Sequence, residues 1–204
     1  MKTLLFVLFA CVQAEDLMLY DDGSFYEEFG VVNPDNLNIT CVYTKRSNWV
    51  AATMKPGNML VFTRNGTIST KIEDKDKYYK SIRFMVRFDD SGDVKYLPLN
   101  VKVFNQTFDD LYNQNLLNSN EGYTVKIKKN NSQKMTIKLD NFNLDGGVST
   151  IIFTRTGNEE QEYDFLIDQL RLDTKNSQNE EYETENGVSS FFVSCVVILL
   201  LSLF

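Results

Sequence analysis

The sequence contains no histidine, and only one of its three cysteines falls in the expected mature domain. The absence of histidine excludes Ser-His-Asp and Cys-His nucleophilic sites, histidine-ligated zinc and histidine-based pH switches. Cys11 lies in an expected signal peptide and Cys195 in a hydrophobic tail, so Cys41 has no partner for a disulfide within the domain. A lone thiol in a secreted protein is either buried or bonded to another molecule. Because Ile39, Cys41 and Tyr43 alternate as in a strand, we expect the Cys41 thiol to be buried. With one thiol and no imidazole we expect no cofactor.

Positive charge is also scarce. The chain has 21 basic and 28 acidic residues, and removal of the expected signal peptide takes away Lys2 and no acid. The balance argues against nucleic acid or anionic lipid as a partner. The remainder, about 170 residues, is enough for one domain with a substantial core.

The N-terminus has the pattern of a secretory signal peptide, which we place at residues 1–14. Lys2 supplies the positive start, an apolar run from Leu4 to Val12 follows, and Ala14 is the expected cleavage residue. We therefore expect the protein to enter the secretory pathway.

The C-terminal part predicts a membrane tether. Residues 173–190 are polar and read as a stalk with an anchor-attachment region, and residues 191–204 form an uncharged hydrophobic tail. Small residues before such a tail are typical of a glycosylphosphatidylinositol (GPI) signal, with Asn186, Gly187 and Ser189 as attachment candidates. A short transmembrane helix and a buried terminal strand are the alternatives. The expected location is the extracellular face of the plasma membrane.

Four Asn-x-Ser/Thr motifs are potential N-glycosylation sites. They begin at Asn38, Asn65, Asn105 and Asn130. Each marks a surface position if it is used in a secreted chain. We place Asn65 and Asn130 at hairpin tips, where a glycan leaves the core undisturbed.

Hydrophobic residues recur with a period of two, which predicts strands. The alternation runs through 82–88, 97–103, 123–127 and 135–139, and further strands are expected at 59–63, 148–153 and 165–172. The pattern predicts an all-β domain over residues 15–172: an antiparallel β-sandwich or jelly roll with one short helix. The helix is expected to start at Thr107, with Asp110 completing a capping pair.

Three turns are predicted from local sequence. Asn65-Gly66 is typical of a type I′ hairpin turn, and Pro56-Gly57 of a type II turn. Residues 128–134 are expected to form the polar loop of a hairpin that joins the strands on either side.

Two kinds of binding site are candidates. Asp89, Asp90 and Asp93 cluster in a loop and are a candidate calcium site, although an acidic Ser-Gly turn is more often only a turn. An aromatic platform for stacking on sugar rings is the other, with Trp49 and Tyr96 as its main candidates. Tyr78, Tyr79 and Tyr112 complete the platform set, and the alternative for all five rings is a place in the core or at its rim.

Two segments resemble known families. Residues 33–43 read NPDNLNITCVY, and Trp49-Val50-Ala51 follows them. Together the two segments resemble the opening of CUB and CUB-like extracellular domains. This resemblance, over about residues 30–65, implies a compact β-sandwich; the cysteines that pair in true CUB domains are missing, so Cys41 lacks that role. Residues 165–172 resemble the closing strand of carbohydrate-binding jelly rolls, which implies a structural role for Asp168.

These patterns lead to one main functional hypothesis and two alternatives. The main hypothesis is a non-enzymatic, GPI-anchored cell-surface glycoprotein that presents its β-sandwich for recognition or adhesion. The alternatives are a carbohydrate-binding module and a glycosidase that uses two carboxylates. The expected partner is an extracellular protein or a glycan, with membrane attachment through a lipid anchor or a short helix.

Overall fold

The structure is a computed structural model that describes residues 16–43, 47–72, 77–90, 92–158, 160–174 and 183–184. The expected signal peptide with Ala14, the attachment candidates Asn186, Gly187 and Ser189, and the tail at 191–204 lie outside the described residues. No helix in the described part of the chain is long and apolar enough to cross a membrane.

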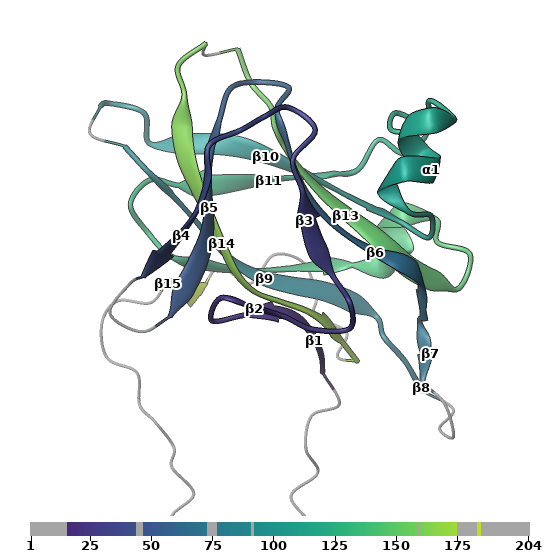
Figure 1. Cartoon of the computed structure of the whole chain (residues 1–204). Coiled ribbons are helices and arrows are strands. Elements are labelled where there is room, and N and C mark those ends of the chain that lie inside the picture. Colours follow the sequence, from purple (N-terminus) through teal and green to yellow (C-terminus); the bar gives the residue numbers. More distant parts are fainter. Residues whose placement is uncertain are drawn as a thin grey trace, which may run out of the picture.

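The chain folds into two layers of antiparallel strands, with one short helix against the outside of one layer (Figure 1). The elements in chain order are β1 (Leu17–Asp21), β2 (Ser24–Phe25), β3 (Gly30–Val32), β4 (Ile39–Tyr43), β5 (Asn48–Met54), β6 (Met59–Ser69), β7 (Lys71–Ile72), β8 (Lys77–Tyr78), β9 (Ser81–Asp89), β10 (Tyr96–Phe104), α1 (Phe108–Asn113), β11 (Tyr123–Lys128), β12 (Gln133–Lys138), the 3-10 helix η1 (Leu139–Phe142), β13 (Gly147–Arg155), β14 (Tyr163–Asp173) and β15 (Glu183–Thr184). The predicted antiparallel β-sandwich with one short helix is confirmed.

Within the described residues, the larger sheet has eight strands and the smaller has five. The larger follows the order β15-β12-β9-β14-β1-β2, with β5 beside β14 and β4 beside β5. The smaller follows β11-β10-β13-β6-β3, and β7 with β8 forms a separate two-stranded ribbon. β15 lies in the segment that we expected to be a stalk, and it pairs with β12 of the larger sheet.

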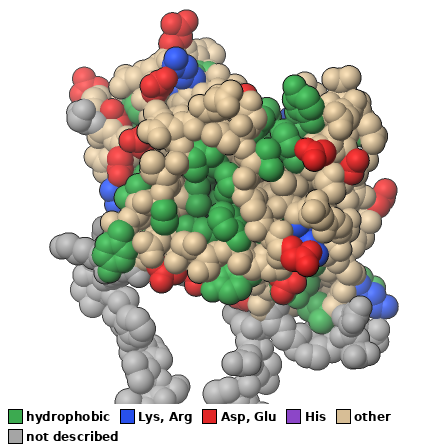
Figure 2. All heavy atoms as spheres, in the orientation of Figure 1, with side chains coloured by type: hydrophobic (Ala, Val, Ile, Leu, Met, Phe, Trp, Pro, Cys, Tyr) green, Lys and Arg blue, Asp and Glu red, His purple; other side chains and the backbone are tan. Residues whose placement is uncertain are grey.

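The period-two residues fill the space between the sheets. Ile82, Phe84, Val86 and Phe88 of β9 are fully buried, and so are Leu97, Leu99, Val101 and Val103 of β10. Phe84 meets Phe153 of the opposite sheet edge-to-face, with ring centroids 5.0 Å apart. In Figure 2 hydrophobic side chains gather down the centre of the view, over the seam between β5 and β3. Burial of the hydrophobic side chains between the two sheets is the main force that stabilises the sandwich.

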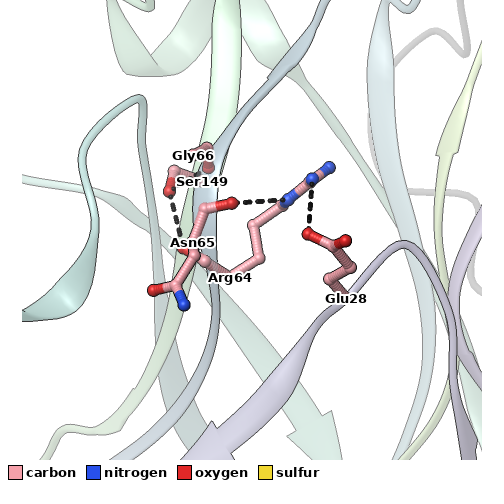
Figure 3. A network of polar contacts seen from close by, with 5 residues as sticks. All are labelled: Glu28, Arg64, Asn65, Gly66 and Ser149. Atoms are coloured by element: carbon pink, nitrogen blue, oxygen red, sulfur yellow. Dashed lines mark hydrogen bonds and ion pairs between the residues drawn. The ribbon is translucent and has the colours of Figure 1, made fainter.

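Asn65-Gly66 does not form the predicted hairpin turn. It lies inside the single long strand β6, where residues 64–67 bulge out between the pairs Thr63↔Thr150 and Ile68↔Val148. The buried Ser149 hydroxyl donates toward the carbonyl oxygens of Arg64 and Gly66, at 3.2 Å and 2.7 Å, and holds the bulge in place (Figure 3). The prediction fails because the strand continues beside β13 on both sides of the Asn-Gly pair, and that pairing is long-range.

The predicted hairpin through residues 128–134 is also wrong. β11 pairs with β10 in the smaller sheet, whereas β12 pairs with β9 in the larger one. The connection between them crosses from one sheet to the other, and Asn130 takes a left-handed conformation there, with φ of 54°. Alternation shows which face of a strand is buried, but it does not show which neighbour the strand pairs with.

Two smaller predictions have opposite outcomes. Thr107 caps α1, because its side chain accepts from the backbone N–H of Asp110, as predicted. Cys41, which we expected to be buried, is exposed. It lies on β4, which pairs only with β5 among the described strands, so the inward face of β4 beyond Ile39 has little of the opposite sheet to pack against.

Candidate functional site

Two adjoining hollows open at the end of the sandwich where α1 and η1 lie. The first, here called the amide hollow, has a volume of about 390 Å³ and is lined by residues 103–106, 119–122 and 141–144. The second, the tyrosine hollow, measures about 530 Å³ and is lined by Thr70, Tyr78, Tyr79, Lys80 and residues 139–140 and 143–144. Asn143 and Leu144 line both hollows, and the two hollows together are here called the depression.

The amide hollow takes its name from four carboxamide side chains: Asn105, Gln106, Asn141 and Asn143. Asn105 and Gln106 are half-buried, and Asn141 and Asn143 are exposed. None of these four amides makes a side-chain hydrogen bond within the described part of the chain. Each therefore keeps both a donor and an acceptor available to a ligand.

The backbone that carries these amides is held in place from outside the hollow. The Thr67 hydroxyl donates to the carbonyl oxygen of Asn105 at 3.0 Å, and the Thr150 hydroxyl donates to that of Gln106 at 2.8 Å. Such anchoring keeps the two amides near their positions before a ligand arrives, which lowers the entropy cost of binding.

The opposite wall of the amide hollow depends on Asn120. Its Nδ2 donates to the Val103 carbonyl at 3.2 Å, and its Oδ1 accepts from the Gly122 N–H at 2.7 Å. Gly122 has φ of 74°, and an added Cβ would lie 2.7 Å from the Val101 carbonyl oxygen. Asn120 is thus a structural residue of the wall, and Gly122 is required for its close approach to β10.

The tyrosine hollow offers an aromatic ring beside charged groups. Tyr78 is 49% exposed, whereas Tyr79 is half-buried and packs against the core. Backbone hydrogen bonds fix this wall, since Tyr79 donates to Thr70 at 2.8 Å and Leu139 donates to Lys80 at 2.9 Å. An exposed ring on a fixed backbone can pack against the apolar face of a flat ligand at low entropy cost.

The charge around the depression is slightly negative. Glu121 and Asp140 face one Lys80 along the two linings, and the whole chain carries a net charge of −7. An anionic ligand would be repelled, while a neutral, hydroxyl-rich ligand meets no electrostatic penalty.

The aromatic residues proposed from sequence divide into buried and exposed ones. Trp49 is only 6% exposed and packs with Ala51, Met85 and Leu166 on the outer face of the larger sheet. Its ring is not available for stacking, so the prediction is wrong for Trp49. Trp49 lies within strand β5, and neighbouring side chains of the sheet cover its ring.

Tyr96 and Tyr112 are exposed, at 55% and 60%. Tyr96 begins β10 and lies opposite Lys128, and Tyr112 is on α1 with its ring beside Phe108. Neither lines a described hollow with other candidate residues, so the five aromatics do not form one platform. Tyr78 shares the tyrosine hollow with one of the available amides, Asn143.

The acidic loop does not form a metal site within the described residues, which hold no group of three or more candidate ligands. Asp89 accepts from the Arg87 guanidinium, with Nη2 to Oδ2 at 2.6 Å. Asp90 lies 3.8 Å from the Lys129 ammonium, and Asp93 is exposed. Asp89 and Asp90 thus lie beside cations of the chain, and the three carboxylates do not form a shared ligand group.

A third hollow of about 700 Å³ opens beside this loop, between the ends of β5, β9 and β14. Its lining includes Asp89, Asp90, Glu162 and Asp164, and Asp164 accepts from the Thr53 hydroxyl at 2.7 Å. A carboxylate-based glycosidase would use this hollow. A ligand here would first have to displace internal hydrogen bonds, so we regard the site as second to the amide and tyrosine hollows.

Asp168 has the structural role that its strand predicts. It is fully buried, and its Oδ1 accepts from the Asp22 N–H at 3.2 Å. Burial raises the pKa of the Asp168 carboxyl above its ordinary value, and hydrogen bonds from Ser47, Gln169 and Asp22 oppose that shift. The residue lies next to a bulge in β14 between Asp168 and Arg171.

Sequence reasoning missed the four amides as a binding set. They come from two connections, one after β10 and one around η1, and only the fold brings them together. The one available signal was the abundance of Asn near strand ends, which also predicts ordinary turns.

No family model matches this sequence, and no curated protein matches it either. Among solved structures, an exo-β-agarase resembles the chain with a TM-score of 0.50 and 13% identity, over 79% of this chain and 25% of the agarase. A mutant of a family 29 carbohydrate-binding module gives a TM-score of 0.48 and 11% identity, over 79% and 93% of the two chains. A family 11 carbohydrate-binding module from Clostridium thermocellum, solved with a β-1,3-1,4-mixed-linked tetrasaccharide, gives 0.44 and 14%, over 80% and 98%.

These comparisons correct the main functional hypothesis. A domain presented for protein recognition or adhesion was expected, but the structures that resemble the chain are carbohydrate-binding modules and agarases. The adhesion hypothesis is therefore withdrawn, and the carbohydrate-binding alternative is taken up below as a proposal. At such low identity the likeness shows a shared fold, so the ligand has to be argued from the geometry of the hollows.

Proposed function

We propose that the protein is a carbohydrate-binding module whose ligand lies along the amide and tyrosine hollows. The observation that carries the proposal is the position of Asn143. It lines both hollows, and so lies between the other three available amides and the hollow with the exposed ring of Tyr78. A pyranose presents hydroxyl groups at its rim and C–H groups on its faces. The amides suit the hydroxyl groups, and the ring suits a C–H face.

The negative charge of the depression and of the chain selects among glycans. Sulfated and carboxylated polysaccharides would bring anionic groups next to Glu121 and Asp140. Neutral glycans avoid this repulsion, so the proposed ligand class is a neutral oligosaccharide or polysaccharide.

The test is a panel of neutral and sulfated glycans, bound to the full chain produced in a bacterial cytoplasm, which adds no N-glycans. We expect binding to neutral members and no gain for sulfated members when the ionic strength is lowered. Binding to sulfated glycans that strengthens at low salt would overturn the proposed selectivity. Absence of binding to every neutral glycan would overturn the function itself.

A further inference from the structure

The four N-glycosylation motifs lie in different surroundings. Asn38 and Asn65 are exposed, and the Asn65 side chain points away from the contacts that hold the β6 bulge (Figure 3). The Asn130 amide is occupied, since its Nδ2 donates to the Asp90 carbonyl at 3.1 Å and its Oδ1 accepts from the Asp90 N–H at 3.0 Å. Asn105 alone among the four lines the amide hollow.

We propose that an N-glycan on Asn105 occupies the amide hollow and competes there with an external glycan. This inference rests on the proposed function and on passage through the secretory pathway. The modification forms a bond from Nδ2 of Asn105 to C1 of the first sugar of a lipid-diphosphate-linked oligosaccharide. The bond from that carbon to the diphosphate breaks, the lipid diphosphate leaves, and one amide proton is released.

The position of Asn105 directs the attached sugar into the hollow. Its carbonyl is held by the Thr67 hydroxyl, and two residues further on Thr107 caps α1, so the backbone here has little freedom. An Asn side chain is short, and Asn105 is half-buried in the lining. The first sugar therefore lies within reach of Gln106, Asn141 and Asn143, the same amides that would bind an external glycan.

The cap also fixes when the modification takes place. The acceptor motif needs the hydroxyl of Thr107, and in the folded chain this hydroxyl donates to Asp110 Oδ2 at 2.6 Å. The motif is accordingly available before α1 forms. The glycan is added first, and the hollow then closes around its first sugars.

The first experiment measures occupancy and competition in the full chain secreted from a glycosylating eukaryotic cell line. Peptide mass spectrometry is expected to find Asn105 modified; an unmodified Asn105 would overturn the proposal. Titration with a neutral oligosaccharide from the panel then compares the wild type with Asn105→Gln and with Asn65→Gln. If the attached glycan fills the hollow about 90% of the time, Asn105→Gln binds about 10-fold more tightly, because the competent fraction rises by that factor.

Asn65→Gln is the matched control, because Asn65 is exposed and lines neither hollow. We expect its affinity to stay within about 2-fold of the wild type, which is below 0.5 kcal/mol. Thr107→Ser keeps both the acceptor motif and the helix cap and should also bind like the wild type. Equal affinity of the wild type and Asn105→Gln would contradict competition.

A second readout needs no external ligand and separates this inference from the proposed function. Peptide-N-glycosidase should release the Asn105 glycan from the folded protein more slowly than the Asn65 glycan, and at the same rate after denaturation. Slow release at Asn105, together with no binding of any free glycan by the bacterial protein, would support the occupied hollow while refuting the binding module. Equal release rates in the folded protein would refute the occupied hollow.

Discussion

At the scale of single residues, Tyr78 is proposed to contact the glycan, whereas the similarly exposed Tyr96 is not. Tyr78→Ala should lower the affinity for a neutral oligosaccharide about 10-fold, since the ligand loses its aromatic contact, worth about 1.4 kcal/mol at that factor. Tyr96→Ala removes an exposed ring that lines no described hollow with the amides, and its affinity should not change. Isothermal titration calorimetry on both variants decides between the two rings. A loss of affinity in Tyr96→Ala alone would show that the oligosaccharide binds at the start of β10 and not in the depression.

Asp168 allows a prediction about pH. Burial raises the pKa of its carboxyl in the folded state, so the folded protein holds a proton that the unfolded chain has already released. Stability from this group is therefore full below the ordinary carboxyl pKa of about 4 and falls as pH rises through the raised value. Asp168→Asn should be more stable than the wild type at pH 7, and the gap should shrink toward pH 4.

Urea unfolding from pH 4 to pH 8 measures that gap. The control is Asp140→Asn, which alters an exposed carboxyl on η1 and should leave the pH profile of stability unchanged. A wild type and an Asp168→Asn variant whose stabilities differ by the same amount at every pH would show that the charge of Asp168 is not what limits stability.

At the scale of secondary structure elements, the bulge in β6 depends on Gly66. Its φ is 82°, a left-handed conformation, and an added Cβ would meet no atom within 4 Å. Gly66→Ala should therefore destabilise the fold by about 1 kcal/mol through backbone conformation alone. Gly30→Ala in β3 is the matched control, because an added Cβ there also meets no atom within 4 Å and φ is not positive. Thermal unfolding should give a lower melting temperature for Gly66→Ala than for Gly30→Ala.

Local sequence predicted the strands of the sandwich well and their partners poorly. The alternation in β9 and β10 was sufficient, because each strand buries one complete face. Asn65-Gly66 misled because the same dipeptide that suits a hairpin turn also suits a bulge, and the choice depends on β13. The β11–β12 connection misled because strand alternation is the same whether the chain turns back or crosses to the other sheet.

The candidate site was less accessible to prediction than the fold. Trp49 attracted attention as the one tryptophan, yet its neighbours in the folded sheet bury it. Asn105 was recognised only as part of a glycosylation motif. The hollow that Asn105 shares with Asn143 arises from the meeting of loops whose positions depend on both sheets, and no periodicity in the sequence reports it.

At the scale of the whole molecule, the expected membrane tether stays a prediction. Phosphatidylinositol-specific phospholipase C should release the protein from intact cells if a GPI anchor holds it. The released protein is measured in the medium by immunoblotting. Retention on the cells, with inositol acylation ruled out, would favour the short transmembrane helix instead.

The central claim is that the depression at the end of the sandwich binds neutral glycans, and Asn143 lines both of its hollows. Asn143 has φ of 49°, so Asn143→Gly removes the amide without straining the backbone. Asn115→Gly is the matched control, since Asn115 is exposed and left-handed at φ of 57° and lines neither hollow.

The most direct measurement is therefore a calorimetric titration of the bacterial protein and these two variants with one neutral oligosaccharide. We expect Asn143→Gly to bind about 5-fold more weakly than the wild type, as for the loss of about 1 kcal/mol of hydrogen bonding, and Asn115→Gly to bind like the wild type. Unchanged affinity in Asn143→Gly, or an equal loss in Asn115→Gly, would contradict the account.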